Sequence, residues 1–357
     1  MKLWKTLAIW IRSKPGFHMW RIIGQDKVVS FLGNSLGQDK LCHAYVFYGP
    51  SGVGKQRMAL TFAQALNCQA SQPPCQECLV CERILSGNHP DIIHLELLSA
   101  EDASDGKAKA EIGVKQVEDI QRAASLPPFE GKYKVFIIHH AEKLSQESSN
   151  RLLKTLEEPG SLNIFILLTA DKSLLLPTVI SRCQILELRY VEINLIRDAL
   201  LEQGLAEEKA ELLSHLSHGR IGWAMEAASN PEILEERKAN LEKIILVLGQ
   251  DEEERFDYAS DISNLFAQNH MAAEAVLDMW LAVFRDMLLL KADASQNMTN
   301  IDYKDILYMA SDKLGLADIR IAIDNILKAR SQLRANANPR LCLEVLMLSL
   351  PLVKEGL

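Results

Sequence analysis

Two features are missing from this sequence: a long apolar run and an excess of positive charge. No uninterrupted hydrophobic stretch approaches the roughly 20 residues that a membrane-spanning helix needs. The formal net charge is −8 over 357 residues, whereas an independent nucleic-acid-binding domain is usually basic. These absences argue against a membrane protein and against a free-standing nucleic-acid binder, although a local basic patch inside a larger assembly is compatible with the composition.

The first 18 residues also lack the features of a secretion signal. Residues 1–18 carry several basic residues around one short apolar stretch at residues 7–11, and no small-residue cleavage site follows. We expect an extension produced by an over-assigned start, because folded-looking sequence begins at Met19 and Trp20. A helix on a membrane surface is the alternative. The lack of a signal predicts a cytoplasmic location.

A phosphate-binding loop is the clearest motif in the chain. It consists of Gly49, Pro50, Ser51, Gly52, Val53, Gly54 and Lys55. The motif follows an apolar run typical of a buried strand and precedes a segment with helical spacing, residues 55–67. The glycines let backbone N–H groups point at phosphate oxygens, and the helix N-terminus favours their negative charge. Lys55 would reach the outer phosphates, so the loop predicts ATP or ADP as a ligand.

The residues that hydrolysis requires beside this loop are absent. The position after the lysine should carry a hydroxyl for Mg²⁺, but it is Gln56, whose carbonyl oxygen is a longer and floppier ligand. The apolar strand at residues 135–138 should end in an acid pair, yet His139 and His140 follow it. Neutral imidazoles do not replace a carboxylate beside Mg²⁺, and losing a general base costs about 10²–10⁴ in rate. The sequence therefore argues against Mg²⁺ and against hydrolysis.

The two adjacent histidines allow two interpretations. Surface or turn positions at the end of a strand are the ordinary one. A His-based metal site is the alternative, but the sequence offers no third ligand at a fixed spacing.

Four of the seven cysteines form a tight cluster. They are Cys68, Cys75, Cys78 and Cys81. Without a secretion signal, disulfides are disfavoured and a closed Cys₄ site for Zn²⁺ is predicted. Four protein ligands leave no open position, so the zinc would be structural. An iron–sulfur cluster, a redox motif and scattered structural cysteines are the alternatives.

Hydrophobic periodicity divides the chain into an α/β part and an all-α part. Short apolar runs alternate with helical segments up to about residue 190 and predict a parallel sheet covered on both faces. These runs are residues 45–48, 92–95, 135–138, 164–169 and 184–188. Beyond them, helix-period segments predominate. We predict a nucleotide-binding domain at 19–190 that includes the cysteine module 68–81, a small helical unit at 191–230 and a helical domain at 231–357. Residues 99–110 are predicted to form a mobile loop.

Together these segments resemble the clamp-loader family of AAA+ proteins. The resemblance runs from about Trp20 to the C-terminus and includes the phosphate loop and the cysteine cluster that follows its helix. It is also carried by IGQD at 23–26, HAYVF at 43–47, NRLLKTLEEP at 150–159, FILLT at 165–169, SRC at 181–183 and NANPRL at 336–341. The family implies a RecA-like AAA+ domain, a small helical lid and a C-terminal helical collar.

The resemblance also implies a function and partners. Five subunits of this family share a collar and load a ring-shaped sliding clamp onto primed DNA. The partners would be gamma/tau-type ATPase subunits and delta, with the clamp and primer-template DNA reached through the complex, as part of a DNA-directed DNA polymerase holoenzyme. Motor subunits of the family keep the hydroxyl residue, the acid pair and a lid arginine. This chain has Gln56, the two histidines and Gly222 there, with Arg220 as a partial substitute.

Two residues take roles from the resemblance. Arg182 would enter the ATP site of a neighbouring subunit as an arginine finger, where a guanidinium offsets charge on the phosphoryl oxygens. Thr169 matches a position whose hydroxyl reads the γ-phosphate. From the residues alone, Arg182 is an ordinary surface arginine at a helix end and Thr169 is a structural strand-end residue.

Three functions therefore stay open. The chain is predicted to be a non-hydrolysing stator that supplies Arg182 to a partner. An ATP-hydrolysing motor of the gamma/tau type is the alternative, favoured by the intact loop and opposed by Gln56 and the histidines. In a third interpretation the loop holds nucleotide permanently as a structural ligand.

Overall fold

The computed structural model describes residues 20–97, 111–160, 162–268, 270–335 and 337–353. The predicted N-terminal extension and the predicted loop at 99–110 lie outside these residues. Two compact units make up the chain: one runs up to Leu205 and includes Gly219–Trp223, and the other comprises Ala206–His218 and Ala224–Leu357. The domain limits predicted at residues 190 and 230 stay predictions.

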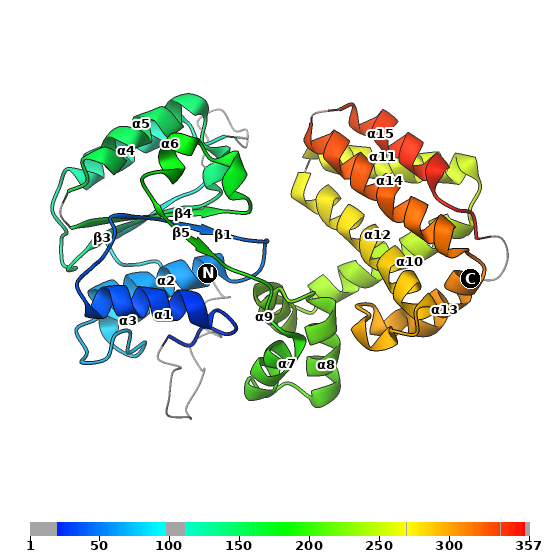
Figure 1. Ribbon diagram of the computed structural model, residues 1–357, viewed down its shortest axis with the longest axis horizontal. Helices are drawn as coiled ribbons and strands as arrows, with labels where there is room; N and C mark the ends of the chain where they lie inside the picture. Colours follow the sequence, from blue (N-terminus) through cyan, green and yellow to red (C-terminus); the bar gives the residue numbers. More distant parts are fainter. Residues whose placement is uncertain (1–19, 98–110, 161, 269, 336, 354–357) are drawn as a thin grey trace. The chain divides into compact units, whose positions relative to one another are not determined.

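A five-stranded sheet lies at the centre of the first unit (Figure 1), in the order β2-β3-β4-β1-β5. All pairings between neighbouring strands are parallel. The strands are β1 Ala44–Tyr48, β2 Ile92–Leu95, β3 Lys134–Ile138, β4 Asn163–Thr169 and β5 Gln184–Glu187. All five predicted strands are confirmed, with small differences at their ends. The sheet confirms the predicted α/β, RecA-like AAA+ class for this part of the chain.

Helices cover both faces of this sheet, as Figure 1 shows for α1, α2 and α3 on one face and α4, α5 and α6 on the other. Tyr45 and Phe47 of β1 belong to one buried core and Val46 to a second, because successive side chains of a strand point to opposite faces. The helices of this unit are α1 Asp26–Gly37, α2 Lys55–Asn67, α3 Leu79–Leu85, α4 Val114–Ala124, α5 Gln146–Glu157, α6 Pro177–Ile180 and α7 Ile193–Glu202.

The second unit is helical, which confirms the predicted all-α part. Its helices are α8 Glu207–Leu216, α10 Glu232–Gly249, α11 Glu252–Gln268, α12 His270–Lys291, α13 Lys304–Asp312, α14 Leu316–Arg334 and α15 Pro339–Ser349, while α9 Ile221–Ser229 belongs partly to each unit. Asn338 caps α15 by accepting a hydrogen bond from the Leu341 N–H, at 3.2 Å. Among the described residues, no helix combines the length and the apolar character needed to cross a membrane.

Arg255 joins the C-terminal ends of two helices inside this unit. Its side chain is buried, with the residue 6% exposed. The guanidinium donates hydrogen bonds to the backbone carbonyl oxygens of Val247, Leu248, Met347, Leu350 and Pro351. The last carbonyls of a helix have no partner within the helix. Those of Val247 and Leu248 in α10 also accept the N–H groups of Gln250 and Val353, so Arg255 is the decisive partner for the carbonyls at the end of α15.

Replacing Arg255 is expected to destabilise the second unit. Arg255→Leu should lower the free energy of unfolding by about 3 kcal/mol or more, because each buried carbonyl left unpaired costs about 1–3 kcal/mol. Urea denaturation followed by circular dichroism measures this. Arg320→Leu is the matched control, since its side chain is 82% exposed and a surface pair is worth about 0–1 kcal/mol. If both variants lowered the free energy of unfolding equally, the stabilising role assigned to Arg255 would be wrong.

Candidate nucleotide and metal sites

The phosphate loop connects β1 to α2 at the carboxyl edge of the sheet. Gly49 has φ 147°, and a β-carbon there would collide with the carbonyl oxygen of Leu188. Gly54 has φ 98° and is the N-cap of α2. Both positions therefore require glycine. In a parallel sheet the carboxyl ends of the strands share one edge, so the loop, the histidines after β3 and Thr169 at the end of β4 lie along the same edge.

Lys55 is folded back onto its own loop. Its ammonium donates hydrogen bonds to the carbonyl oxygens of Gly49 and Pro50, the latter at 2.8 Å. Burial lowers the pKa of Lys55 to about 8, and the negative charge of Glu142 opposes this shift. A phosphate group would have to displace two carbonyl partners to bind this ammonium. Gln56 lies exposed on the first turn of α2.

The segment Gly219–Trp223 packs against the phosphate loop within the same unit. The Gly222 N–H donates a hydrogen bond of 2.7 Å to the Gly52 carbonyl oxygen. A β-carbon at Gly222 would lie 2.8 Å from that oxygen, so any side chain at this position would force the backbone apart. The stem of Arg220 also lies beside Gly52.

Glu142 is a carboxylate near this loop that the sequence analysis missed. It lies in the short turn Ala141–Lys143, its side chain is 12% exposed, and its Oε1 is 3.5 Å from Nδ1 of His140. Burial raises the pKa of Glu142, but His140 and the Thr169 hydroxyl outweigh burial and hold the pKa below its usual value. An ionised carboxylate is therefore present near Lys55. The motif places its acid pair at the two positions that follow the strand, and Glu142 lies beyond them.

Thr169 is buried at the end of β4, where it pairs with Tyr48 of β1. Its hydroxyl donates to the Asp171 carbonyl oxygen at 3.0 Å and accepts from the Asp171 N–H at 3.2 Å. These bonds support the structural interpretation of this residue. Its role as a γ-phosphate sensor stays a prediction.

Arg182 follows α6 and binds a carboxylate of its own chain. Its Nη2 lies 2.6 Å from Oε1 of Glu157, and its Nη1 donates to the Thr178 carbonyl oxygen at 2.9 Å. The side chain is 35% exposed. A partly exposed ion pair contributes about 0–1 kcal/mol, so a stronger anion can replace Glu157.

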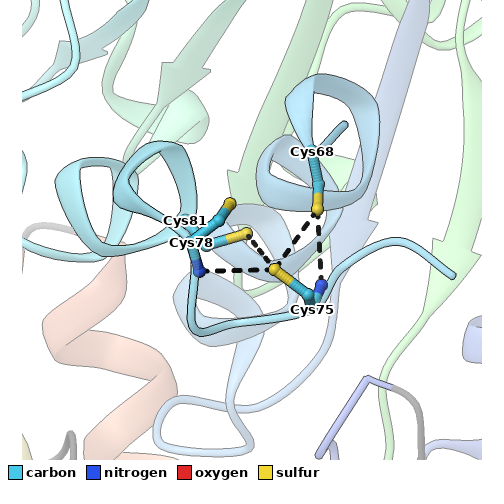
Figure 2. A group of neighbouring side chains, drawn as sticks. All are labelled: Cys68, Cys75, Cys78 and Cys81. Carbon is cyan, nitrogen blue, oxygen red and sulfur yellow. Dashed lines mark hydrogen bonds between the residues drawn. The ribbon is translucent and has the colours of Figure 1, made fainter. Parts of the chain in front are cut away.

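The four clustered cysteines converge on one point, and none forms a disulfide (Figure 2). Cys68 follows α2, Cys78 precedes α3 and Cys81 lies within it. The sulfur of Cys75 is 3.5 Å from that of Cys68 and 4.0 Å from that of Cys81, and all four sulfurs lie within 4.8 Å of one another. Tetrahedral zinc with Zn–S bonds of about 2.3 Å needs sulfurs about 3.8 Å apart, so the set fits a metal ion.

Backbone N–H groups support thiolate at part of this cluster. The N–H groups of Cys75 and Cys78 point at the sulfurs of Cys68 and Cys75, at 3.4 and 3.3 Å. Burial raises the pKa of Cys75, but hydrogen bonds from the backbone at Glu77 and Cys78 outweigh it and lower the pKa to about 7. Burial raises the pKa of the Cys81 thiol. A metal ion would supply the positive charge that four neighbouring thiolates require.

His139 is not the surface residue that the ordinary interpretation of the sequence expected. It is buried, with 8% exposed, and its Nε2 lies 3.0 Å from His94 Nδ1 and 3.2 Å from Glu96 Oε1. His94 lies on β2, which pairs with β3. The expected lack of a third ligand is therefore wrong, because strand pairing brings together residues 45 positions apart. His140 is exposed and has a left-handed backbone conformation, with φ 49°, as expected of a turn.

Known protein families and individual proteins are similar to this chain. The model of the family "DNA polymerase III, delta subunit" matches residues 24–192, and that of its C-terminal part matches residues 232–351. The chain is 33% identical over 331 residues to DNA polymerase III subunit delta' of Bacillus subtilis, covering 91% of this chain and 96% of the relative. The chain belongs to the family of DNA polymerase III clamp-loader subunits. The motifs quoted above favour the delta-prime type, and this relative confirms that resemblance.

Other clamp-loader subunits are also similar. The tau subunit of B. subtilis is 28% identical over 349 residues, which are 91% of this chain and 60% of that protein. A solved structure of a gamma subunit-related protein from Thermotoga maritima aligns over 89% of this chain and 97% of that one, with a TM-score of 0.43 and 15% identity. Similarity to both delta-prime and tau means that membership in this clamp-loader family does not itself decide whether the chain hydrolyses ATP.

Proposed function

We propose that this protein is a non-hydrolysing stator of the bacterial DNA polymerase III clamp loader and supplies Arg182 to the ATP site of a neighbouring subunit. It acts in the cytoplasm, beside gamma/tau-type ATPases and delta, and reaches the sliding clamp and primer-template DNA through the complex. The observation that carries the proposal is the phosphate loop: Lys55 binds the loop's own carbonyls, and histidines replace the acid pair.

The contacts of Arg182 support its role in trans. It stands at the end of α6 with a third of its side chain exposed and only a weak, exchangeable partner in Glu157. A polyphosphate carries more charge than one carboxylate and binds a guanidinium through several oxygens. Release from Glu157 on assembly therefore has a small energetic cost.

An exposed apolar stripe on α15 supports assembly through the helical collar. Leu341, Val345 and Leu348 are 61%, 65% and 53% exposed. Their spacing places them on one face of the helix, and such a face on a subunit of a known assembly fits contact with another helix.

A gamma/tau-type motor is the alternative, and two observations favour it. The glycines and Lys55 of the loop are intact, and Glu142 keeps a carboxylate near them. In the third interpretation, a permanently bound nucleotide would survive purification, and an empty site in ATP-containing buffer would exclude it.

For the four-cysteine cluster we propose a structural Zn²⁺ ion. Its ligands Cys68, Cys75, Cys78 and Cys81 would hold the loop between α2 and α3. The separations of the sulfurs support this choice, and the closed ligand set leaves no position for chemistry.

Steady-state ATP hydrolysis by the purified chain distinguishes the stator from the motor. We expect the same background turnover in the wild type, Lys55→Ala and Glu142→Gln, because the Mg²⁺ hydroxyl and the acid pair are missing. Turnover that Lys55→Ala abolishes would make the motor correct. A parallel loss in Glu142→Gln would then identify the carboxylate that replaces the acid pair.

Arg182→Ala is expected to slow clamp-stimulated hydrolysis by the partner ATPase by about 10³-fold or more, because arginine fingers contribute about 10³–10⁵ in rate. The assay uses the reconstituted complex with clamp and primed DNA, and gel filtration checks that assembly is intact. Glu157→Gln is the matched control: it removes the intrachain partner of Arg182 and should keep full turnover. Unchanged hydrolysis in Arg182→Ala would refute the role in trans.

Metal analysis of the purified chain tests the zinc proposal. One zinc per chain should survive dialysis against EDTA, and Cys78→Ser should lose it and expose residues 68–81 to limited proteolysis. Iron with visible absorption would identify an iron–sulfur cluster instead. A folded wild-type chain without zinc or iron would contradict a metal at this cluster.

A further inference from the structure

We propose that His94, Glu96 and His139 form a second metal site, which binds Zn²⁺ or a similar divalent transition-metal ion and keeps one coordination position open. The site uses none of the four cysteines. It also uses no residue of the phosphate loop, although His139 stands at one of the two acid-pair positions.

The separations of the three ligand atoms suit one small ion. His139 Nε2 lies 3.0 Å from His94 Nδ1 and 3.2 Å from Glu96 Oε1, and all three atoms lie within 4.8 Å of one another. Tetrahedral zinc with bonds of about 2.0–2.1 Å needs ligand atoms about 3.3 Å apart. The two separations measured from His139 Nε2 lie within about 0.3 Å of this value.

His94 stands on β2, and Glu96 and His139 directly follow the paired strands β2 and β3, so the site is largely preformed. His94 is in register with Ile137 of β3, and the His139 N–H donates to the Leu95 carbonyl oxygen at 2.8 Å. The two imidazole rings stack at a centroid distance of 5.4 Å. Gln116 of α4 donates to the backbone carbonyl of Glu96 at 2.9 Å. Metal ligands fixed by strands and hydrogen bonds need little reorganisation on binding.

The chemical types of the three ligands favour particular metal ions. Two imidazoles and one carboxylate suit zinc and its neighbours in the first transition row, whereas Mg²⁺ prefers an all-oxygen shell. A neutral imidazole offers one nitrogen lone pair to a metal ion. Glu96 is 60% exposed, which leaves the fourth position open to water and makes the ion exchangeable.

The place of His139 in the chain also links the second metal site to the residues near the phosphate loop. His140 follows His139 directly in the chain, and Glu142 lies three positions after His139. An ion bound to His139 would fix the start of the turn that carries Glu142, without touching nucleotide.

A cobalt titration tests the site in the full-length protein with its cysteine cluster already metal-loaded. We expect one further equivalent of Co²⁺ per chain. It should give weak visible d–d bands without the intense near-ultraviolet band of thiolate-to-cobalt charge transfer. Glu96→Gln should weaken this binding at least about tenfold, since even residues that only support a metal ligand contribute 10–100-fold. Glu96 is exposed, so this variant is expected to fold.

Glu211→Gln is the matched control. Glu211 Oε1 lies 3.2 Å from His215 Nε2, the same separation as in the Glu96–His139 pair, but the other ring nitrogen of His215 bonds the Met298 carbonyl oxygen. This variant should bind Co²⁺ as the wild type does. Three results would overturn the proposal: no further equivalent, cobalt with only a thiolate spectrum, or equal affinity of the wild type and Glu96→Gln.

Discussion

The nucleotide site and the histidine site of the first unit both depend on the parallel pairing of its strands. Tyr48 of β1 is in register with Thr169 of β4, and Ile138 of β3 with Leu167 of β4. The phosphate loop, the histidine turn and Thr169 therefore leave the sheet along one edge. The pairing of β2 with β3 brings His94 beside His139. If one strand slipped by one residue against its neighbour, its side chains would turn to the other face of the sheet. The residues along the carboxyl edge would then separate, and so would His94 and His139.

The phosphate loop combines an intact backbone shape with side-chain partners that do not favour hydrolysis. Its glycines keep the backbone conformation that cradles phosphate, yet Lys55 and the Gly52 carbonyl are both engaged by protein groups. The Gly222 contact excludes a side chain at the position where the resemblance implies an arginine in motor subunits. Each of these features favours a loop that stays fixed over one that opens and closes with each nucleotide. A fixed loop is also compatible with the proposed role of Arg182 in trans.

What the sequence predicted follows from short-range signals, and what it missed follows from long-range pairing. The five strands have apolar runs, the phosphate loop has its own spacing, and the cysteines lie within one short segment, so each is visible locally. Glu142 was missed because its importance comes from the fold of a turn near Lys55. The His94–His139 contact and the Arg182–Glu157 pair join different elements, which no local spacing reveals. His139 was expected at the surface because its position after a strand is typical of a turn. Its burial comes from residues elsewhere in the chain, which the local sequence does not reveal.

Arg255 has a consequence for recognition as well as for stability. By binding the last carbonyls of α15 from within the core, it holds that helix rigidly before any partner arrives. A neighbouring subunit that docked on the exposed side of α15, as proposed, would therefore meet a preorganised surface. That association would not include the entropic cost of ordering the helix, so its strength would depend on the shape and the apolar contacts of the two surfaces.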